Sequence, residues 1–310
     1  MTFNLYKKIP KLKNYKSDIL SQGETNRLLE KWILKEESFM AARLGSVECD
    51  ALRTYLQINT LQKANPLVKL YYFGKGYRSN WGNVTLENLN KNAGFFYRDS
   101  KDLDRFCELY LQCLSKIDLM GIWFNIFEDY IVTHFSPKAR LTMLSYLEPY
   151  NHSIPWSRAL KNKTILVIHP FKNSIEKQYR KRELLFDNVN VLPDFNIKTI
   201  KAVQSHANQK VSYESWFDAF QFLLDEIADT EFDLAIIGAG AYGLPMASFI
   251  KSMGKQAVHL GGATQILFGI KGNRWDNHPI ISKLYNQYWI RPSLNETPRN
   301  SHLVEKECYW

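Results

Sequence analysis

The sequence predicts an α/β fold: a Rossmann-like, doubly wound architecture around a mostly parallel sheet. Short apolar runs alternate with segments of helical periodicity along the chain, which is the pattern of strands joined by crossover helices. The clearest buried strand is residues 163–169, KTILVIH. Late in the chain, an apolar run at 233–237 leads through glycines into a helical pattern that Gly254 closes, and a second run follows at 256–260. Strand, glycine turn, helix and strand in this order form one βαβ unit of a parallel sheet.

The other expected elements precede this unit. They are a helix at 25–35 capped by Thr25, a strand at 38–44, helices at 47–56 and 101–116, a strand at 118–124, helices at 136–146 and 174–186, a short strand at 189–192 and a helix at 213–227. The aromatic, Gly- and Asn-rich stretch at 71–97 is expected to be a loop or a flap over a substrate.

The length of 310 residues allows one large α/β domain or two smaller ones. We expect a basic irregular lead-in at residues 1–22, a single α/β domain at 23–290 and a tail at 291–310 packed on that domain. No apolar run reaches the length of a membrane span, and the first residues lack the apolar core of a signal peptide, so a cytoplasmic location is expected. The cysteines lack metal-binding spacing and are expected to be buried or incidental thiols.

The formal net charge of +9 suits nucleic acid, an anionic membrane face or phosphorylated substrates as partners. Basic residues are densest in the first sixteen residues and at 177–182, and no stripe of Lys and Arg alternates with aromatic residues. Nucleic acid is therefore not an expected partner. The basic lead-in favours peripheral contact with the anionic inner leaflet of a membrane, and a solvated basic face is the simpler alternative.

Candidate chemistry lies at three strand ends, because ligands of an open parallel sheet bind beyond the carboxyl ends of its strands. The first end runs from Arg43 through Gly45 and Ser46 into a helix that carries Glu48 and Asp50 near its start. Carboxylates at a helix N-terminus stabilise the helix dipole without a catalytic role. The alternative is that Glu48, with Asp50 or Ser46, serves as a general base or as a ligand of Mg²⁺ or Mn²⁺.

The second strand end carries His169, followed by Lys172, Asn173 and Ser174 at the start of a helix. Free backbone N–H groups, the ammonium and the amide at this position could cradle a phosphate. The alternative is an ordinary strand-end histidine beside a solvated, charged helix face.

The third strand end carries Gly238, Gly240 and Gly243, which satisfy the G-x-G-x-x-G dinucleotide fingerprint. That fingerprint also requires an acidic residue about twenty positions later to hold the ribose, and none ends the second strand. The glycines fit phosphate binding at the helix N-terminus, or only the φ angles of a tight turn.

Polar residues cluster around and after the second strand of this unit. Arg274 could pair with a phosphate through two hydrogen bonds, and Trp275 could stack on a base or sugar. Walker-type, G-x-S-x-G, H-E-x-x-H and paired-cysteine zinc motifs are missing from the sequence, which disfavours P-loop ATPases, serine esterases and zinc proteases.

Two stretches resemble a known family. FMAARLGSVECDAL resembles the opening strand–turn–helix of GT-D-type bacterial glycosyltransferases, which carry an R-[FL]-G-D-x-E-like motif. IIGAGAYGLPMASFIKSMGKQAVHLGG resembles the closing βαβ unit of the same family. VIHPFKNSIEKQY and GIKGNRW look like a distinct branch of similar proteins found among polysaccharide-synthesis genes. The resemblance implies a single Rossmann-like domain that transfers sugar from a nucleotide-sugar donor, commonly a UDP-sugar.

Within that motif, Arg43, Gly45 and Glu48 match the family's Arg, Gly and Glu, whereas its metal-linked Asp falls on Ser46. Either Asp50 replaces the missing carboxylate or the reaction uses no metal. The resemblance implies Glu48 and Asp50 as catalytic residues and Glu48 as a ligand of a divalent cation, Mn²⁺ or Mg²⁺. The residues expected to bind the nucleotide sugar are Arg43, Gly45, Ser46, His169, Lys172, Asn173, Ser174, Gly238, Gly240, Tyr242, Gly243, His259, Gly261, Gly262, Gln265, Lys271, Arg274 and Trp275.

The leading hypothesis is therefore a glycosyltransferase that acts on a glycan or lipid-linked acceptor in cell-surface polysaccharide assembly. A lipid-linked acceptor would suit the basic lead-in. An NAD(P)-dependent oxidoreductase that uses the glycine turn is the second hypothesis, and a non-catalytic nucleotide-binding protein is the third.

Overall fold

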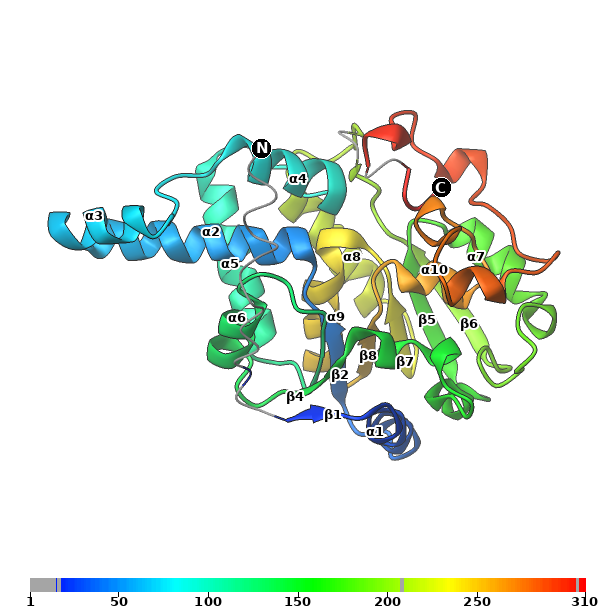
Figure 1. Cartoon of the computed structure of the whole chain (residues 1–310). Coiled ribbons are helices and arrows are strands. Elements are labelled where there is room, and N and C mark those ends of the chain that lie inside the picture. The colour runs from blue at the N-terminus through cyan, green and yellow to red at the C-terminus, as the bar shows by residue number, and fades with distance from the viewer. Residues whose placement is uncertain (1–14, 16–17, 207–208, 305–306) are drawn as a thin grey trace.

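The computed structural model describes residues 15, 18–206, 209–304 and 307–310. Its centre is one eight-stranded sheet in the order β1-β4-β3-β2-β8-β7-β5-β6, and every strand pairing is parallel (Figure 1). Helices flank both faces of the sheet. The predicted α/β class is confirmed, and the all-parallel sheet is consistent with a Rossmann-like doubly wound fold.

The strands are β1 (Ile19–Leu20), β2 (Phe39–Arg43), β3 (Leu119–Ile122), β4 (Arg140–Met143), β5 (Thr164–His169), β6 (Asn196–Lys201), β7 (Leu234–Ile237) and β8 (Gln256–His259). The central strands are buried on both faces and their sequences are almost continuously apolar, as expected for a parallel sheet covered by helices. Gln256 is a buried polar exception, and its amide donates to the carbonyls of Trp32 and Glu37 at 3.0 Å.

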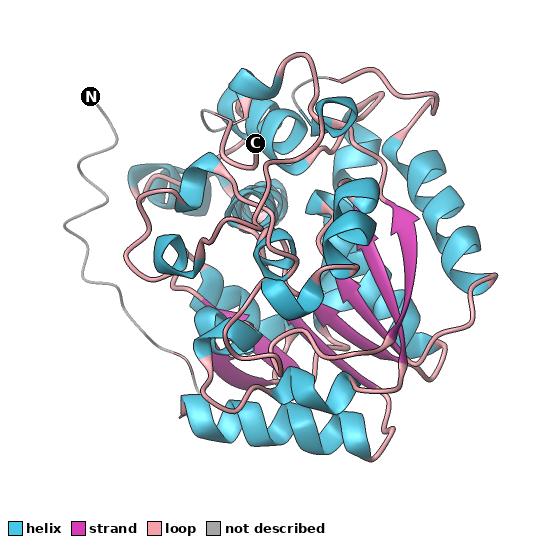
Figure 2. Ribbon diagram, turned by 90° about the vertical axis from the view of Figure 1, so that its right-hand side faces the viewer, coloured by secondary structure: helices cyan, strands magenta, loops and turns pink. Residues whose placement is uncertain are grey.

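The helices are α1 (Gln22–Leu34), α2 (Ser46–Lys63), α3 (Pro66–Gly74), α4 (Asn83–Ala93), α5 (Ser100–Leu114), α6 (Glu128–Phe135), α7 (Lys172–Tyr179), α8 (Trp216–Ala228), α9 (Gly243–Ser252) and α10 (Ala263–Leu267). Helices lie on both sides of the sheet (Figure 2). Alternate strand residues point to opposite faces, so the core has two layers. Met40 and Ala42 face the layer that α2, α5, α8 and α9 cover, and Phe39 and Ala41 face the layer of α1, α7 and α10.

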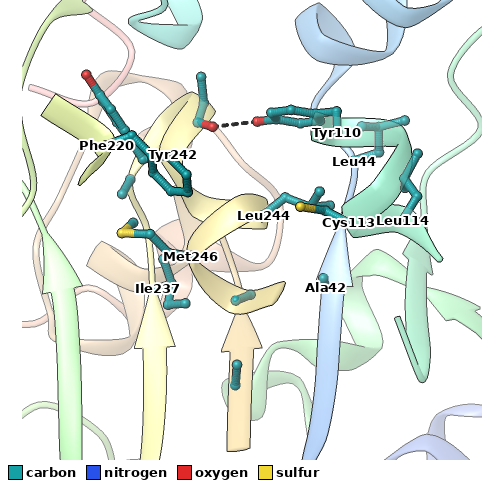
Figure 3. Close-up of a cluster of buried hydrophobic side chains, with 14 of the residues drawn as sticks. Ala42, Leu44, Tyr110, Cys113, Leu114, Phe220, Ile237, Tyr242, Leu244 and Met246 are labelled. Carbon is teal, nitrogen blue, oxygen red and sulfur yellow. Dashed lines mark hydrogen bonds between the residues drawn. The ribbon is translucent and has the colours of Figure 1, made fainter. Parts of the chain in front are cut away.

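The first layer is built on α9, which packs against β2 and β8 (Figure 3). Leu244 and Met246 of α9 are fully or almost fully buried there. The Tyr110 hydroxyl of α5 donates to the carbonyl of Ala241 at 2.6 Å, which fixes the turn before α9. All four cysteines, including Cys113 in this layer, are buried, and none of them forms a disulfide.

Several predicted elements are wrong. Residues 136–146, expected to be helical, contain β4, because pairing with β1 and β3 overrides an apolar spacing that also fits a helix. The strand expected at 189–192 is missing from that described stretch, and β6 lies at Asn196–Lys201 instead. Its polar, half-exposed sequence lacks the signal of a buried strand. The stretch 71–97, expected to be loop, contains the end of α3 and all of α4.

The predicted cap of the first helix is also wrong. The N-cap of α1 is Ser21, which exchanges hydrogen bonds with Glu24 in a capping box. Thr25 is instead fully buried, and its hydroxyl lies 2.6 Å from that of Thr142 on β4.

The predicted lead-in lies mostly outside the described residues, although β1 falls within its range. The described part of residues 291–310 packs against the domain. Val304 and Cys308 are buried in the layer of α1, α7 and α10, and the Gln265 amide of the domain donates to the Tyr309 carbonyl at 3.1 Å. Among the described helices, none combines the length and the apolar character needed to cross a bilayer.

Candidate functional site

A pocket lies at the carboxyl ends of the strands and measures about 780 Å³ when the space open to solvent at its mouth is included. β5 and β7 are neighbours in the sheet. The chain continues from β5 to β6 at the edge of the sheet, and from β7 to β8 in the opposite direction. The position between β5 and β7 is therefore a switch point of the sheet. Ligands of open α/β sheets bind at such points.

Many predicted site residues line this pocket. They are Arg43, Gly45, Ser46, Glu48, His169, Gly238, Gly240, His259, Gly261, Gly262, Gln265 and Arg274. The lining residues that the sequence did not point to are Val47, Asn92, Ala93, Trp123, Pro170, Phe171, Gln204, His206, Tyr309 and Trp310. Among the residues around the pocket, Asp50, Lys172, Asn173, Ser174, Tyr242, Gly243, Lys271 and Trp275 are not part of its lining. Residues far apart in the sequence therefore meet because parallel strands end at one edge.

Arg43 ends β2 and enters the pocket beside Trp123, with its guanidinium carbon 4.6 Å from the centre of the indole. Trp123 follows β3 and is fixed by its own indole N–H, which donates to the Leu44 carbonyl at 2.9 Å. The Nε atom of Arg43 is buried and has no hydrogen-bond partner among the described residues. A half-buried cation with an unused donor is arranged to receive an acceptor oxygen from a ligand.

Gln265, on α10, presents the complementary group to the same pocket. Its amide nitrogen donates to the backbone carbonyls of Ile270, Lys271 and Tyr309 at 3.1–3.3 Å. Its amide oxygen is buried and, within the described part of the chain, accepts no hydrogen bond. Because the amide nitrogen is fully used, the orientation of the amide is fixed and the free oxygen can accept from a ligand hydroxyl.

Glu48 is 7% exposed and lies in the first turn of α2, where the helix dipole favours a carboxylate. A Cβ atom at Gly45 would overlap Oε2 of Glu48, so the carboxylate lies directly against the N-cap residue. Gly45 is therefore needed because any side chain there would displace Glu48. The Glu48 carboxylate therefore stabilises the dipole of α2 and also lines the pocket.

Three buried histidines face the pocket: His169, His206 and His259. Burial lowers the pKa of His169 to about 3, with a smaller contribution from nearby His206, and burial lowers the pKa of His206 to about 4. Burial, followed by the charge of Arg43, lowers the pKa of His259 to about 3. At neutral pH these rings are uncharged and act only through hydrogen bonds.

The partners of two of these rings fix their tautomers. Nδ1 of His169 accepts from the Phe171 N–H at 3.0 Å, so the proton is on Nε2. Nδ1 of His259 lies 3.2 Å from the Ile237 carbonyl and must donate, which leaves its Nε2 as an acceptor. The pocket thus contains one neutral imidazole donor and one neutral imidazole acceptor.

The glycine turn is shaped by packing against these histidines. A Cβ atom at Gly238 would lie 2.7 Å from the His169 ring, and one at Gly240, whose φ is +51°, would lie 2.6 Å from the Ala93 carbonyl. A Cβ atom at Gly243 would overlap His259. Packing thus accounts for all three glycines of the G-x-G-x-x-G pattern.

Tyr242 and Trp275 are buried and lie outside the lining of the pocket. Tyr242, drawn in Figure 3, stacks on Trp216 with ring centres 4.8 Å apart. Trp275 contacts Tyr309 at 6.2 Å between ring centres and supports that part of the wall. Arg274 is exposed at the mouth, with its guanidinium 4.9 Å from the centre of Tyr309, and Lys271 lies over Tyr285 at 5.1 Å.

Asp50 points away from the pocket into a network that joins α2 to α4 and to the loop between α3 and α4. Its carboxylate accepts from Arg53, from Arg78 at 2.9 Å and from the Thr85 hydroxyl at 2.8 Å. Although burial acts to raise the pKa of Asp50, the neighbouring arginines and Thr85 lower it overall. Asp50 thus lies outside the pocket lining and joins α2 to α4.

The expected phosphate cradle at the start of α7 is filled by the chain itself. Glu296, which is 1% exposed, accepts from the N–H of Asn173 at 2.7 Å and from the Ser174 hydroxyl at 2.5 Å. The Ser293 hydroxyl donates to the same carboxylate at 2.6 Å. Lys172 faces a neighbouring groove instead. A carboxylate thus occupies the helix N-terminus where an anion was expected.

We expect Glu296→Ala to lower the free energy of unfolding by roughly 3 kcal/mol, because buried donors at the N-terminus of α7 lose their acceptor. Urea denaturation measures the loss. Sulfate should restore part of the stability of this variant by binding the vacated N–H groups. Glu183→Ala, at an exposed ion pair, is the control and should change little. If sulfate stabilised the Glu296→Ala variant and the Glu183→Ala control equally, Glu296 would not be the group that occupies the N-terminus of α7.

Among the residues that the structure describes, no group of three or more His, Cys, Asp or Glu side chains is placed to hold a metal ion. Glu48 is the single side-chain carboxylate in the described lining of the pocket. Magnesium in proteins is often bound by one or two carboxylates together with substrate phosphates. Glu48 can fill that role only if the substrate supplies the other ligands.

Comparison of the chain with protein-family models, with curated proteins and with solved structures finds no match. The function must therefore be argued from the pocket itself.

Proposed function

We propose that this protein is a glycosyltransferase that moves a sugar from a nucleotide-sugar donor, a UDP-sugar in the simplest case, to a glycan or lipid-linked acceptor in cell-surface polysaccharide assembly. The observation that carries the proposal is the pair of unused buried groups in one pocket, Nε of Arg43 and the amide oxygen of Gln265. A phosphate oxygen suits the first and a sugar hydroxyl suits the second.

The charges of the pocket also favour a diphosphate. The charged side chains of its lining are those of Arg43, Arg274 and Glu48, and the three histidines add no charge at neutral pH. An excess of positive charge in a partly enclosed site stabilises an anion. The aromatic walls, formed by Trp123 and Tyr309, offer flat surfaces for a base or a sugar ring.

In the proposed reaction, the acceptor oxygen forms a bond to the anomeric carbon as the bond from that carbon to the diphosphate oxygen breaks. The leaving diphosphate takes the electron pair, and Arg43 and Arg274 stabilise its charge. Glu48 receives the proton of the acceptor hydroxyl. Glu48 is also the side chain that would hold a Mn²⁺ or Mg²⁺ ion together with the donor's phosphates, and such an ion neutralises charge on a diphosphate.

Thermal-shift measurements with UDP, GDP, CMP, TDP, NAD and NADP, each with and without Mn²⁺, test the proposal. We expect one nucleoside diphosphate, at about 100 times its Kd, to stabilise the protein by about 2.7 kcal/mol and to raise Tm by several degrees. Arg43→Met should abolish this shift, because it removes the buried donor and its charge while keeping much of the side-chain volume.

The other outcomes decide between the alternatives. Stabilisation by NAD or NADP alone would reject the glycosyltransferase in favour of an oxidoreductase. A diphosphate that stabilises the protein without any hydrolysis or transfer of its sugar derivatives would favour a non-catalytic nucleotide-binding protein. A shift that requires Mn²⁺ would assign Glu48 as a metal ligand.

A further inference from the structure

Helix α3 forms the tip of an arm that leaves the body of the molecule. The arm begins at the pocket, where Ser46 and Glu48 start α2. The 18 residues of α2 span about 27 Å along the helix axis. After the connection at 64–65, α3 lies at the end of the arm, far from the sheet (Figure 1).

Apolar side chains of α3 are exposed to an unusual degree. None of its residues is buried, and the exposed fractions are 80% for Leu67, 71% for Leu70 and 47% for Phe73. The N-terminus of α3 is nevertheless well capped, because the Asn65 side chain accepts from the Val68 N–H at 2.9 Å and Pro66 occupies the first turn. Exposed leucines scattered singly are ordinary, but a cluster of this kind on one short helix marks a contact surface.

The charge around α3 has one sign. Between Asp50 and Glu87 the sequence contains no carboxylate, and Lys63, Lys69 and Lys75 lie within or beside α3. Tyrosines accompany them: Tyr71 is 62% exposed and lies under the Lys75 ammonium at 5.7 Å. Apolar residues flanked by lysines and tyrosines are the composition of helices that lie in a bilayer interface.

The base of the arm is fixed to the body. Arg78, which follows α3, donates to Asp50 of α2 and to Thr85 of α4. The same carboxylate accepts from Arg53, so the loop after α3 is connected to two helices. The exposed tip therefore has a set orientation relative to the pocket.

We propose that residues 63–75, the arm tip, dock on an anionic lipid bilayer, with Leu67, Leu70 and Phe73 entering the interface. The lysines of the arm tip then face the lipid headgroups. Docking does not depend on the proposed reaction, although it would hold the pocket close to a lipid-linked acceptor. A bilayer fits better than a protein partner, because lysines flank the apolar residues and no carboxylate lies between Asp50 and Glu87 in the sequence.

Flotation of the full-length protein with lipid vesicles tests the proposal. We expect binding to phosphatidylcholine vesicles that contain about 30% phosphatidylglycerol, and at least tenfold weaker binding to phosphatidylcholine alone. Replacing Leu67, Leu70 and Phe73 together with Ser should reduce binding at least tenfold. Changing Lys63, Lys69 and Lys75 to Gln should reduce it roughly 100-fold at low salt, since each cation contributes about a fivefold factor.

Matched variants separate the arm tip from other surfaces. Leu294→Ser with Ile280→Ser, at exposed positions elsewhere, should leave binding and Tm unchanged. The arm-tip serine variant should also keep its Tm, because the replaced side chains are exposed. Binding that survives the arm-tip changes but disappears when Lys7, Lys8, Lys11, Lys13 and Lys16 become Gln would overturn the proposal. Concentration-dependent dimerisation that the serine variant abolishes, without vesicle binding by the unmodified protein, would overturn it in favour of a second copy of the chain.

Discussion

We expect Glu48→Gln to lower the rate of the proposed sugar transfer by about 10²- to 10⁴-fold, the usual contribution of a general base. Glutamine keeps the size of the side chain but cannot take the acceptor proton. Glu48 is the single side-chain carboxylate in the described pocket lining, so no other side chain there can replace it as a carboxylate base. The measurement is the single-turnover release of nucleoside diphosphate, with nucleotide-induced Tm shifts as a second readout. Binding without Mn²⁺ should survive the substitution.

Two further variants test whether position or charge matters. Gly45→Ala keeps the carboxylate but forces it to move, because the added methyl group would overlap it, so transfer should again fall while the protein remains folded. Asp50→Asn removes the neighbouring carboxylate, which lies outside the pocket, and should lower stability by about 1–2 kcal/mol with a smaller effect on transfer. Normal transfer by Glu48→Gln would remove Glu48 from the mechanism.

We expect the protein to lose roughly 3–4 kcal/mol of stability between pH 7.5 and pH 5. The pKa values of His169, His206 and His259 are about 3, 4 and 3 in the folded protein, below the ordinary value of 6.5. The unfolded chain therefore binds more protons as the pH falls below 6.5, and each histidine costs about 2 kcal/mol at pH 5. Glu148 acts in the opposite direction, because burial raises its pKa to about 7 and its protonation favours the folded state.

Urea denaturation at each pH measures this dependence, and the comparison of variants isolates the histidines. His206→Asn should reduce the loss between pH 7.5 and pH 5 by about 2 kcal/mol, because one group that must stay neutral is gone. His134→Asn, at an exposed position on α6, should leave the dependence unchanged. An unchanged dependence in the His206 variant would show that folding does not lower the pKa of His206.

Sequence reasoning could find the parts of the site that follow from strand geometry. Buried parallel strands have a clear apolar signal, and their carboxyl ends must meet at one edge. Arg43, His169, Gly238 and His259 end or directly follow such strands, and the structure brings all of them to one pocket. The rule also applies to Trp123, which follows β3.

The rest of the site depends on contacts that no local pattern encodes. His206 follows β6, an edge strand. Because the sequence of β6 is polar, neither the strand nor the position of the histidine after it could be predicted. Tyr309 and Trp310 reach the pocket from the tail, where no strand ends. Glu296 fills the N-terminus of α7 from more than a hundred residues away, and this long-range contact removes a phosphate site that local sequence favoured.

The order of strands has a consequence for how the molecule is made. β2 pairs with β8, so Phe39 lies beside Gln256, and the seam between the two halves of the sheet runs beneath the pocket. During synthesis, β2 cannot pair with β8, and the two halves of the sheet cannot join, until β8 has left the ribosome. Pairing over such a sequence separation makes folding slow, because the long intervening loop must be ordered first. Arg43 and His259 stand on opposite sides of this seam, so the nascent chain cannot recognise substrate until its sheet is complete.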